Sequence, residues 1–231
     1  MSLSSKNAHI DKTSILIVED EPLLCDAYRL VFENISNNTS FSNFDLDIYN
    51  DFSSAKEAIL GVDDDLHLVI LDIRLRSGDY LAGNSGEGLG ILLRKNLPKT
   101  KIIVVTSLTS NHRLHMILKY INPEGLLIKS EIDFISIQND IVAVLKGNNV
   151  YSQTTIDFFK QDVGVKLNLD DIDRKILYLL SKGVKVNKLT NYVPLTTSGI
   201  EARKRRIAKV FNMNKPSIAD LLHASKQKGI I

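Results

Sequence analysis

The segment SILIVEDEP, residues 14–22, joins a run of four aliphatic residues to three acids and a proline. A continuous run of Ile, Leu and Val is typical of a strand that is buried on both faces, as the strands of a parallel sheet are. Apolar residues then recur at helical spacing, at Leu24, Tyr28, Val31 and Ile35. The segment therefore predicts a buried strand that ends in acidic residues and leads into a helix.

The same alternation of strand and helix continues to residue 146. Further apolar runs predict strands at Leu46–Tyr49, Leu68–Leu71, Ile102–Thr106 and Gly125–Ile128. Helical patterns separate these runs, near Ser53–Leu60, Gly86–Asn96, Asn111–Tyr120 and Glu131–Lys146. Five such units predict a flavodoxin-like α/β domain, a doubly wound sheet of five parallel strands in the order 2-1-3-4-5 with helices on both faces.

The pattern changes after Gly147. Polar residues mix with Phe158 and Phe159, which we interpret as a linker with a short helix. From Leu169 onward a helical stripe begins at Asp170 or Asp171, ends at Gly183, and no strand pattern returns. We therefore expect an all-α second domain. The predicted organisation is a disordered leader over residues 1–13, an α/β domain over 14–146, a linker over 147–167 and an all-α domain over 168–231.

The net charge of +2 conceals an asymmetry between the two predicted domains. Residues 1–147 contain 14 Lys and Arg against 20 Asp and Glu, a net charge of −6. Residues 148–231 contain 15 against 7, a net charge of +8. A basic domain favours a polyanionic partner such as nucleic acid, although ribosomal and other basic proteins share such a balance.

Composition also bears on the compartment. No stretch approaches the roughly 18 consecutive apolar residues of a membrane span, and the polar first residues lack the apolar centre of a secretory signal. The single cysteine, Cys25, lies in an apolar helical pattern and has no second cysteine to pair with. We therefore expect a cytoplasmic protein with no membrane partner.

Polar side chains stand at the ends of four predicted strands. Glu19 and Asp20 follow the first strand, Asp72 ends the third, Thr106 ends the fourth and Lys129 follows the fifth. In a doubly wound sheet these ends meet at one edge, which is where ligands bind. Clustered carboxylates repel one another unless a hard cation neutralises them, so we expect Mg²⁺ or Mn²⁺ at this edge.

With these residues in this order, residues 14–146 resemble the receiver domain of bacterial response regulators. The resemblance implies that Asp72 accepts a phosphoryl group, that Thr106 binds a phosphoryl oxygen and that Lys129 places a positive charge beside it. It also implies a set of metal ligands: Glu19, Asp20, Asp72 and the backbone carbonyl of Arg74. Such a protein accepts a phosphoryl group without being an enzyme, apart from slow autodephosphorylation.

Two features depart from the receiver pattern. The position three residues before Lys129 usually carries Tyr or Phe as part of the switch, whereas this chain has Leu126; Tyr120 could compensate, or output could depend on dimerisation. The interval from Asp72 to Gly86 is also longer than in typical receivers, which implies an inserted loop. The insertion could be a tolerated surface loop, or its Arg76, Asp79 or Tyr80 could modify access of the phosphodonor.

The all-α domain contains a helix-turn-helix pattern. A short helix around Val186–Asn191 precedes a turn with Pro194, and a longer helix, capped by Thr196 or Thr197, runs to about Asn212. At about 100° per residue, one face of the longer helix is polar and largely basic, formed by Ser198, Glu201, Ala202, Arg205, Arg206 and Lys209. Such a helix suits the major groove of DNA.

Residues 167–231 resemble the LuxR-type (NarL/FixJ) output domain. The resemblance implies base contacts from Glu201, Ala202 and Arg205. It implies phosphate contacts from Arg203, Lys204, Arg206 and Lys209 of the same helix and from Lys188 of the short helix. Alternatively, Arg203 and Lys204 cover the edge of the core, and Glu201 and Arg205 form an exposed ion pair. The resemblance also implies a dimer contact through the last helix, about Ser217–Gln227, although its Ile218, Leu221 and Leu222 could instead serve only the domain core.

Together the two resemblances predict a DNA-binding transcriptional response regulator of a two-component system. Mg²⁺-dependent phosphorylation of Asp72 would promote dimerisation and DNA binding. The implied partners are double-stranded DNA, a cognate sensor histidine kinase, a second copy of the chain and RNA polymerase. The alternative is a phosphorylation-independent DNA-binding regulator whose receiver serves dimerisation. A haloacid-dehalogenase-like hydrolase is disfavoured because Arg74 stands where such enzymes need a second aspartate.

Overall fold

The computed structural model describes residues 12–62, 66–75, 85–164 and 169–231. These residues group into two compact units. The first unit runs up to Ser107 and resumes over Ile121–Tyr151, and the second joins Leu108–Tyr120 to Ser152–Ile231. Most of the predicted leader and the predicted loop insertion with Arg76, Asp79 and Tyr80 lie outside the described residues.

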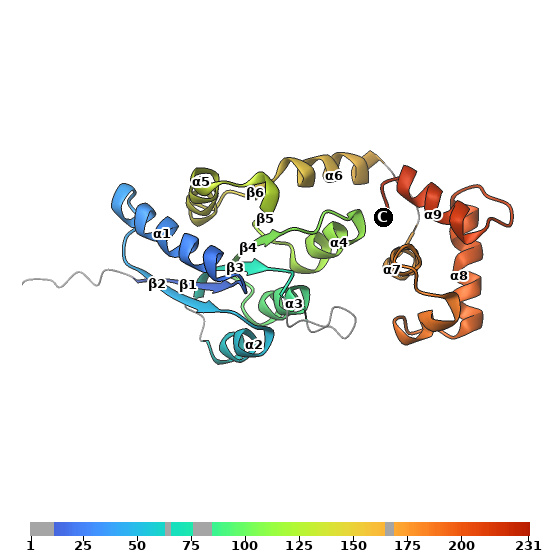
Figure 1. Cartoon of the computed structure of the whole chain (residues 1–231), viewed down its shortest axis with the longest axis horizontal. Helices are drawn as coiled ribbons and strands as arrows, with labels where there is room; N and C mark the ends of the chain where they lie inside the picture. Colours follow the sequence, from blue (N-terminus) through green and yellow to red (C-terminus); the bar gives the residue numbers. More distant parts are fainter. Residues whose placement is uncertain (1–11, 63–65, 76–84, 165–168) are drawn as a thin grey trace, which may run out of the picture. The chain divides into compact units, whose positions relative to one another are not determined.

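The first unit is a parallel α/β sheet (Figure 1). Its strands are β1 (Thr13–Val18), β2 (Phe44–Tyr49), β3 (Leu66–Asp72), β4 (Lys101–Thr106), β5 (Gly125–Ile128) and β6 (Val150–Tyr151). Its helices are α1 (Pro22–Asn38), α2 (Phe52–Gly61), α3 (Gly86–Asn96), the 3-10 helix η2 (Lys129–Glu131) and α5 (Phe134–Leu145). The predicted α/β fold is confirmed, and the order is β2-β1-β3-β4-β5-β6 with all neighbours parallel.

The strand β6 is the part of this sheet that the sequence did not predict. It lies in the segment interpreted as a linker and pairs with β5 through Val150 and Tyr151. Two residues are too few to show a periodic pattern. The predicted short helix of that segment is α6 (Gln153–Gly164), which belongs to the second unit.

Burial explains why β1, β3 and β4 are continuous aliphatic runs. Helices α1 and α5 cover one face of the sheet and α2 and α3 the other (Figure 1), so side chains on both faces of the central strands are enclosed. Ile15, Ile17, Ile70 and Ile103 are at most 1 % exposed and pack with Phe32 of α1 in one core. This packing fixes the strand ends, where the polar residues follow.

The second unit is helical. Its elements are α4 (Asn111–Met116), most of a π-helix η1 (Ile117–Ile121), α6, α7 (Asp171–Ser181), the 3-10 helix η3 (Val186–Asn191), α8 (Thr197–Val210) and α9 (Ile218–Gln227). The helix predicted over Asn111–Tyr120 thus changes to π geometry after Met116. No helix in the described part of the chain is long and apolar enough to cross a membrane.

Local sequence signals set the ends of these helices. The Asp170 side chain caps α7 by accepting a hydrogen bond from the backbone N–H of Asp173, and Gly183, with φ +80°, follows its end. The Thr196 hydroxyl caps α8 by accepting from the N–H of Gly199 at 3.2 Å. The predicted helix-turn-helix is therefore present as η3, a turn and α8.

Gly86 sets the approach of α3 to the end of β3. A Cβ atom at this position would lie 2.2 Å from the carbonyl oxygen of Asp72 and 2.5 Å from the Cα of Ile73. Both are backbone atoms, so no side chain can move aside to make room. A glycine here therefore allows the first turn of α3 to pack directly on the strand end that carries Asp72.

We expect Gly86→Ala to lower the free energy of unfolding by about 1–3 kcal/mol, because overpacking forces the backbone to shift. Urea unfolding of the full chain measures this. The matched control is Gly61→Ala, where a Cβ meets nothing within 4 Å, and there the free energy of unfolding should rise by about 0.5–1 kcal/mol. Equal effects of the two substitutions would contradict the close approach described here.

Candidate functional site

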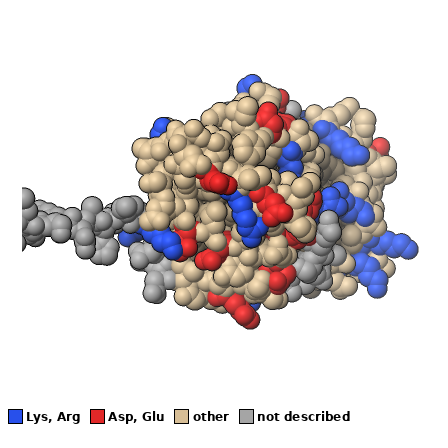
Figure 2. All heavy atoms as spheres, turned by 60° about the vertical axis from the view of Figure 1, so that its left-hand side comes forward, with Lys and Arg blue, Asp and Glu red and all other residues tan. Residues whose placement is uncertain are grey.

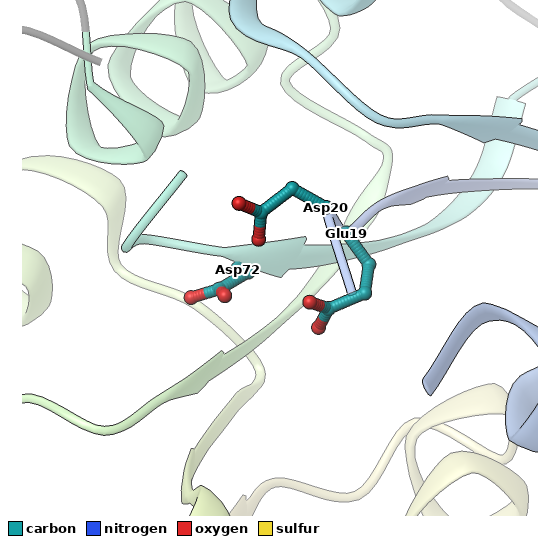
Figure 3. Close-up of side chains that lie close together, drawn as sticks. All are labelled: Glu19, Asp20 and Asp72. Carbon is teal, nitrogen blue, oxygen red and sulfur yellow. The ribbon is translucent and has the colours of Figure 1, made fainter. Parts of the chain in front are cut away.

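Three carboxylates converge at the carboxyl edge of the sheet (Figure 3). Glu19 and Asp20 directly follow β1, and Asp72 is the last residue of β3. One oxygen from each lies within 4.8 Å of the others. Glu19 and Asp72 are 1 % and 3 % exposed, so their charges are poorly screened by water and need compensation within the protein.

Lys129 supplies part of this compensation. Its Nζ lies 2.9 Å from Oε2 of Glu19 and 2.9 Å from Oδ2 of Asp72. The other oxygen of Asp72, Oδ1, accepts a hydrogen bond from the backbone N–H of Arg74 at 2.7 Å. Glu19 similarly accepts from the N–H of Glu21 at 3.1 Å. The Asp72 carboxylate is thus oriented by a contact at each oxygen.

The pKa values follow from this burial and pairing. Burial raises the pKa of Glu19, and the Lys129 ammonium opposes that rise without cancelling it. For Lys129, burial lowers the pKa, but the hydrogen bonds to Asp72 and Glu19 outweigh it and leave the pKa above its ordinary value. Lys129 therefore stays charged and offsets one of the three carboxylate charges.

The donor set fits a divalent cation. Three carboxylates with one ammonium leave an excess of two negative charges when all are ionised, and a divalent ion would balance them. The converging ligand atoms are all oxygens, which are the ligands that Mg²⁺ and Mn²⁺ prefer. The charge and the chemistry of the cluster both suit such an ion.

A cavity of about 440 Å³ opens beside the carboxylates. It is lined by Asp20, Glu21, Asp72, Arg74, Leu75, Ser107 and Lys129. Since one water takes roughly 30 Å³ in the liquid, the cavity can hold a phosphoryl-sized group together with a partly hydrated ion. Glu21, Leu75 and Ser107 were not predicted as site residues from the sequence, although each lies within three residues of a strand end.

The hydroxyl residues at the end of β4 occupy different positions. Thr106, which the sequence predicts to bind a phosphoryl oxygen, is completely buried and does not line the cavity. Ser107, the next residue, does line it. Alternation along a strand sends neighbouring side chains to opposite faces, so a sequence pattern cannot decide which of two adjacent hydroxyl residues faces the cavity.

The two candidate switch residues are both engaged in packing or hydrogen bonding. Leu126 is completely buried in β5, where it pairs in register with Val104 of β4 and Tyr151 of β6. The Tyr120 hydroxyl donates a hydrogen bond to Asp171 at the start of α7, and this contact raises the pKa of Tyr120 to about 12. Neither residue lines the cavity beside Asp72.

The segment after β4 is attached to the C-terminal helices of the second unit. Asp171 accepts from the Lys119 ammonium at 2.6 Å as well as from Tyr120. The ring of His112 stacks on that of Tyr178, with centroids 4.7 Å apart. These contacts fix α4 and η1 against α7.

The predicted DNA-contact residues divide into exposed and paired side chains. Ala202, Arg205 and Lys209 of α8 and Lys188 of η3 are exposed. Arg206 binds Asp170 and Asp173 at 2.8 Å each, and Arg203 binds the same two carboxylates. Lys204 binds Glu201 at 3.0 Å, whereas the alternative considered from the sequence paired Glu201 with Arg205.

Charged side chains of both signs lie on the face of the molecule drawn in Figure 2. Figure 2 shows acidic side chains spread over much of the face drawn there, together with some Lys and Arg. The sequence count places the excess of acids in residues 1–147 and the excess of bases in residues 148–231.

The chain thus combines a doubly wound parallel α/β unit that has a carboxylate cluster at its edge with a helical unit that has a helix-turn-helix. No protein-family model matches the chain, and no curated protein matches it. Solved structures of the response regulator RcsB do match. RcsB of Salmonella enterica serovar Typhimurium, bound to promoter P1flhDC in the presence of the phosphomimetic BeF3−, is 18 % identical with a TM-score of 0.61, over 92 % of this chain and 97 % of that one.

Two further RcsB structures also match this chain. An RcsB–DNA complex is 18 % identical with a TM-score of 0.59, over 93 % of this chain and 98 % of that one. The isolated REC domain of Salmonella RcsB, also with BeF3−, is 20 % identical with a TM-score of 0.50, over 64 % and 98 %. The predicted fold, a doubly wound parallel α/β domain followed by an all-α helix-turn-helix domain, is confirmed.

We expect stability to depend on pH through His112. Burial, with Arg113 and His115 adding to it, lowers the pKa of His112 from 6.5 to about 3. Between these values the unfolded chain binds a proton that the folded chain does not, so the stabilisation is complete above pH 6.5 and is lost as pH falls toward 3. The loss is up to about 1.4 kcal/mol per pH unit.

Urea unfolding on both sides of pH 6.5 measures this dependence. His112→Phe keeps a ring for Tyr178 and removes a buried Nδ1 that has no hydrogen-bond partner in the described structure, so it should flatten the pH dependence without loss of stability. The control His223→Gln, at an exposed position of α9, should show the same pH dependence of stability as wild type. If the free energy of unfolding depended on pH equally in wild type and in His112→Phe, the assignment of this dependence to His112 would be wrong.

Proposed function

We propose that this protein is a DNA-binding transcriptional response regulator, with Asp72 of a receiver over residues 14–146 as its phosphoacceptor. The observation that carries the proposal is the position of Lys129, within 2.9 Å of both Glu19 and Asp72, beside a cavity at the strand ends. One ammonium among three carboxylates suits a site that takes up a divalent ion and then a phosphoryl group.

In the proposed reaction an oxygen of Asp72 attacks the phosphorus of a phosphodonor. The bond from phosphorus to the donor atom breaks, and the donor leaves with the bonding electron pair and takes up a proton. Lys129 holds its charge beside the incoming oxygens, and the Arg74 N–H keeps the carboxylate oriented. A bound Mg²⁺ or Mn²⁺ would neutralise phosphoryl charge, with Glu19, Asp20, Asp72 and the Arg74 carbonyl as ligands.

The acceptor role is not that of an enzyme, because the chain itself is modified and at most slowly loses the phosphoryl group. A sensor histidine kinase is the proposed natural donor. Ser107 lines the cavity, so it joins Thr106 as a candidate to bind a phosphoryl oxygen.

DNA binding is the proposed output of the helical domain over residues 168–231. The exposed face of α8 presents Arg205 and Lys209 around the small Ala202, with Lys188 nearby on η3. The similar RcsB structures include DNA complexes, among them two dimers on two parallel DNAs. We propose a homodimer on duplex DNA, with RNA polymerase as a further partner, in the cytoplasm.

A phosphorylation-independent regulator is the second candidate. It is favoured by Leu126, a buried aliphatic residue where an aromatic switch would be expected. In that case the receiver would serve dimerisation alone, and the carboxylate cluster would have no role in output.

Incubation with Mg²⁺ and acetyl phosphate should add the mass of one phosphoryl group, and Asp72→Ala should abolish the addition. Asp20→Asn should raise the Mg²⁺ concentration needed, because the cluster loses one ligand charge. Asp26→Asn, at an exposed position on α1, is the control and should change nothing. Mass spectrometry gives the modification, and light scattering and fluorescence anisotropy follow dimerisation and DNA affinity. No modification would favour the second candidate.

Substitutions on α8 should separate base contacts from phosphate contacts. Arg205→Ala should weaken binding to a duplex selected from a random library by about 1–3 kcal/mol and relax its specificity. Lys209→Ala should weaken selected and random duplexes alike and reduce the salt slope by about one. Fluorescence anisotropy over a salt series measures both. If Arg205→Ala weakened binding to the selected and the random duplex equally, Arg205 would not contact bases.

A further inference from the structure

A groove lies between the C-terminal half of α8 and the turn that leads to α9. Its volume is about 290 Å³. It is lined by Glu201, Lys204, Arg205, Ala208, Lys209, Met213, Asn214, Lys215, Pro216 and Leu221. The floor is partly apolar, since Ala208 and Leu221 belong to the core of the second unit.

The lining residues make the groove strongly basic. Glu201 is the one acid among them, and it binds Lys204 at 3.0 Å. Arg205, Lys209 and Lys215 remain as exposed cations, and none of them forms an ion pair within the described part of the chain. Three uncompensated cations around one small groove favour an anion of compact size.

The backbone of the turn brings Lys215 to this groove in an uncommon conformation. Asn212 and Lys215 have φ values of +56° and +46°. Asparagine tolerates the left-handed region, but a lysine adopts it rarely. The turn is held in place by a hydrogen bond from the N–H of Met213 to the carbonyl of Ala208 at 2.8 Å. A lysine kept at a position where Gly or Asn would be less strained suggests a functional constraint.

The start of α9 does not supply the anion-binding groups itself. Ser217 caps the helix by accepting from the N–H of Asp220, and the Asp220 carboxylate accepts from the N–H of Ser217. This capping box uses backbone donors that could otherwise bind an anion. Recognition must therefore come from the side chains of Lys209, Lys215 and Arg205.

We propose that this groove binds a backbone phosphate of duplex DNA, with Lys215 as its principal contact and Lys209 beside it. The proposal rests on the DNA-binding function proposed above and adds a residue outside the recognition helix to the interface. Lys188 of η3 and Lys215 of the turn lie in the segments before and after α8. Phosphate contacts from both would fix the register of α8 in the major groove, because such contacts position a protein without reading sequence.

The test uses Lys215→Gln in the full chain, with Lys175→Gln, an exposed lysine of α7 outside the groove, as the matched control. Fluorescence anisotropy with a random-sequence and a selected duplex, over a salt series, gives the affinity and its salt slope. Lys215→Gln should weaken binding to both duplexes by the same factor. It should also reduce the salt slope by about 0.9, the value for one lost phosphate contact. Lys175→Gln should match wild type in affinity and salt slope.

A second variant separates binding from folding. Lys215→Gly relieves the left-handed backbone, so its melting temperature should rise while its DNA affinity and salt slope fall as in Lys215→Gln. A purely structural role for Lys215 would leave the salt slope at the wild-type value, and that result would overturn the proposal.

One outcome rejects the phosphate groove alone, and another rejects DNA binding as well. If the wild type binds duplex DNA and Arg205→Ala weakens that binding, but Lys215→Gln behaves like Lys175→Gln, the groove is not a phosphate site and DNA binding stands. If the wild type binds neither duplex, even after incubation with Mg²⁺ and acetyl phosphate, both proposals are wrong.

Discussion

The structure of the first unit depends on charge balance at one edge of a parallel sheet. Parallel strands end together, so the residues after β1 and β3 bring Glu19, Asp20 and Asp72 within 4.8 Å. Leaving such a buried charge unpaired costs about 3–5 kcal/mol, and Lys129 from the end of β5 removes only part of that cost. The remaining negative charge costs stability and at the same time suits a divalent ion, whose oxygen ligands would be these carboxylates.

Much of this edge could be predicted from the sequence. The strands β1, β3 and β4 are continuous aliphatic runs, so their positions follow from burial, and so do the positions of the polar residues at their ends. Residues that depend on fine geometry could not be predicted. Whether Thr106 or Ser107 lines the cavity depends on the twist of a strand end, and the two-residue strand β6 leaves no periodic signal.

The helical unit shows a second limit of sequence patterns. A helical wheel shows which face of α8 is polar but not which acids lie opposite it, and here Asp170 and Asp173 bind Arg203 and Arg206. A pattern of strands and helices likewise does not show that Asp171 binds Lys119 and Tyr120. Long-range ion pairs have no local signature.

These pairs give the first turn of α7 two structural roles. Asp170 and Asp173 hold two arginines of α8, and the adjacent Asp171 holds the segment that follows β4. Because Arg203 and Arg206 are occupied in this way, DNA phosphates would have to compete with two carboxylates for them, and Asp173 is completely buried. Moving Arg203 and Arg206 from Asp173 to a phosphate is unfavourable, since it leaves a buried carboxylate unpaired. The cations that can meet a phosphate without this cost lie at the exposed positions around α8, which are Lys188, Arg205, Lys209 and Lys215.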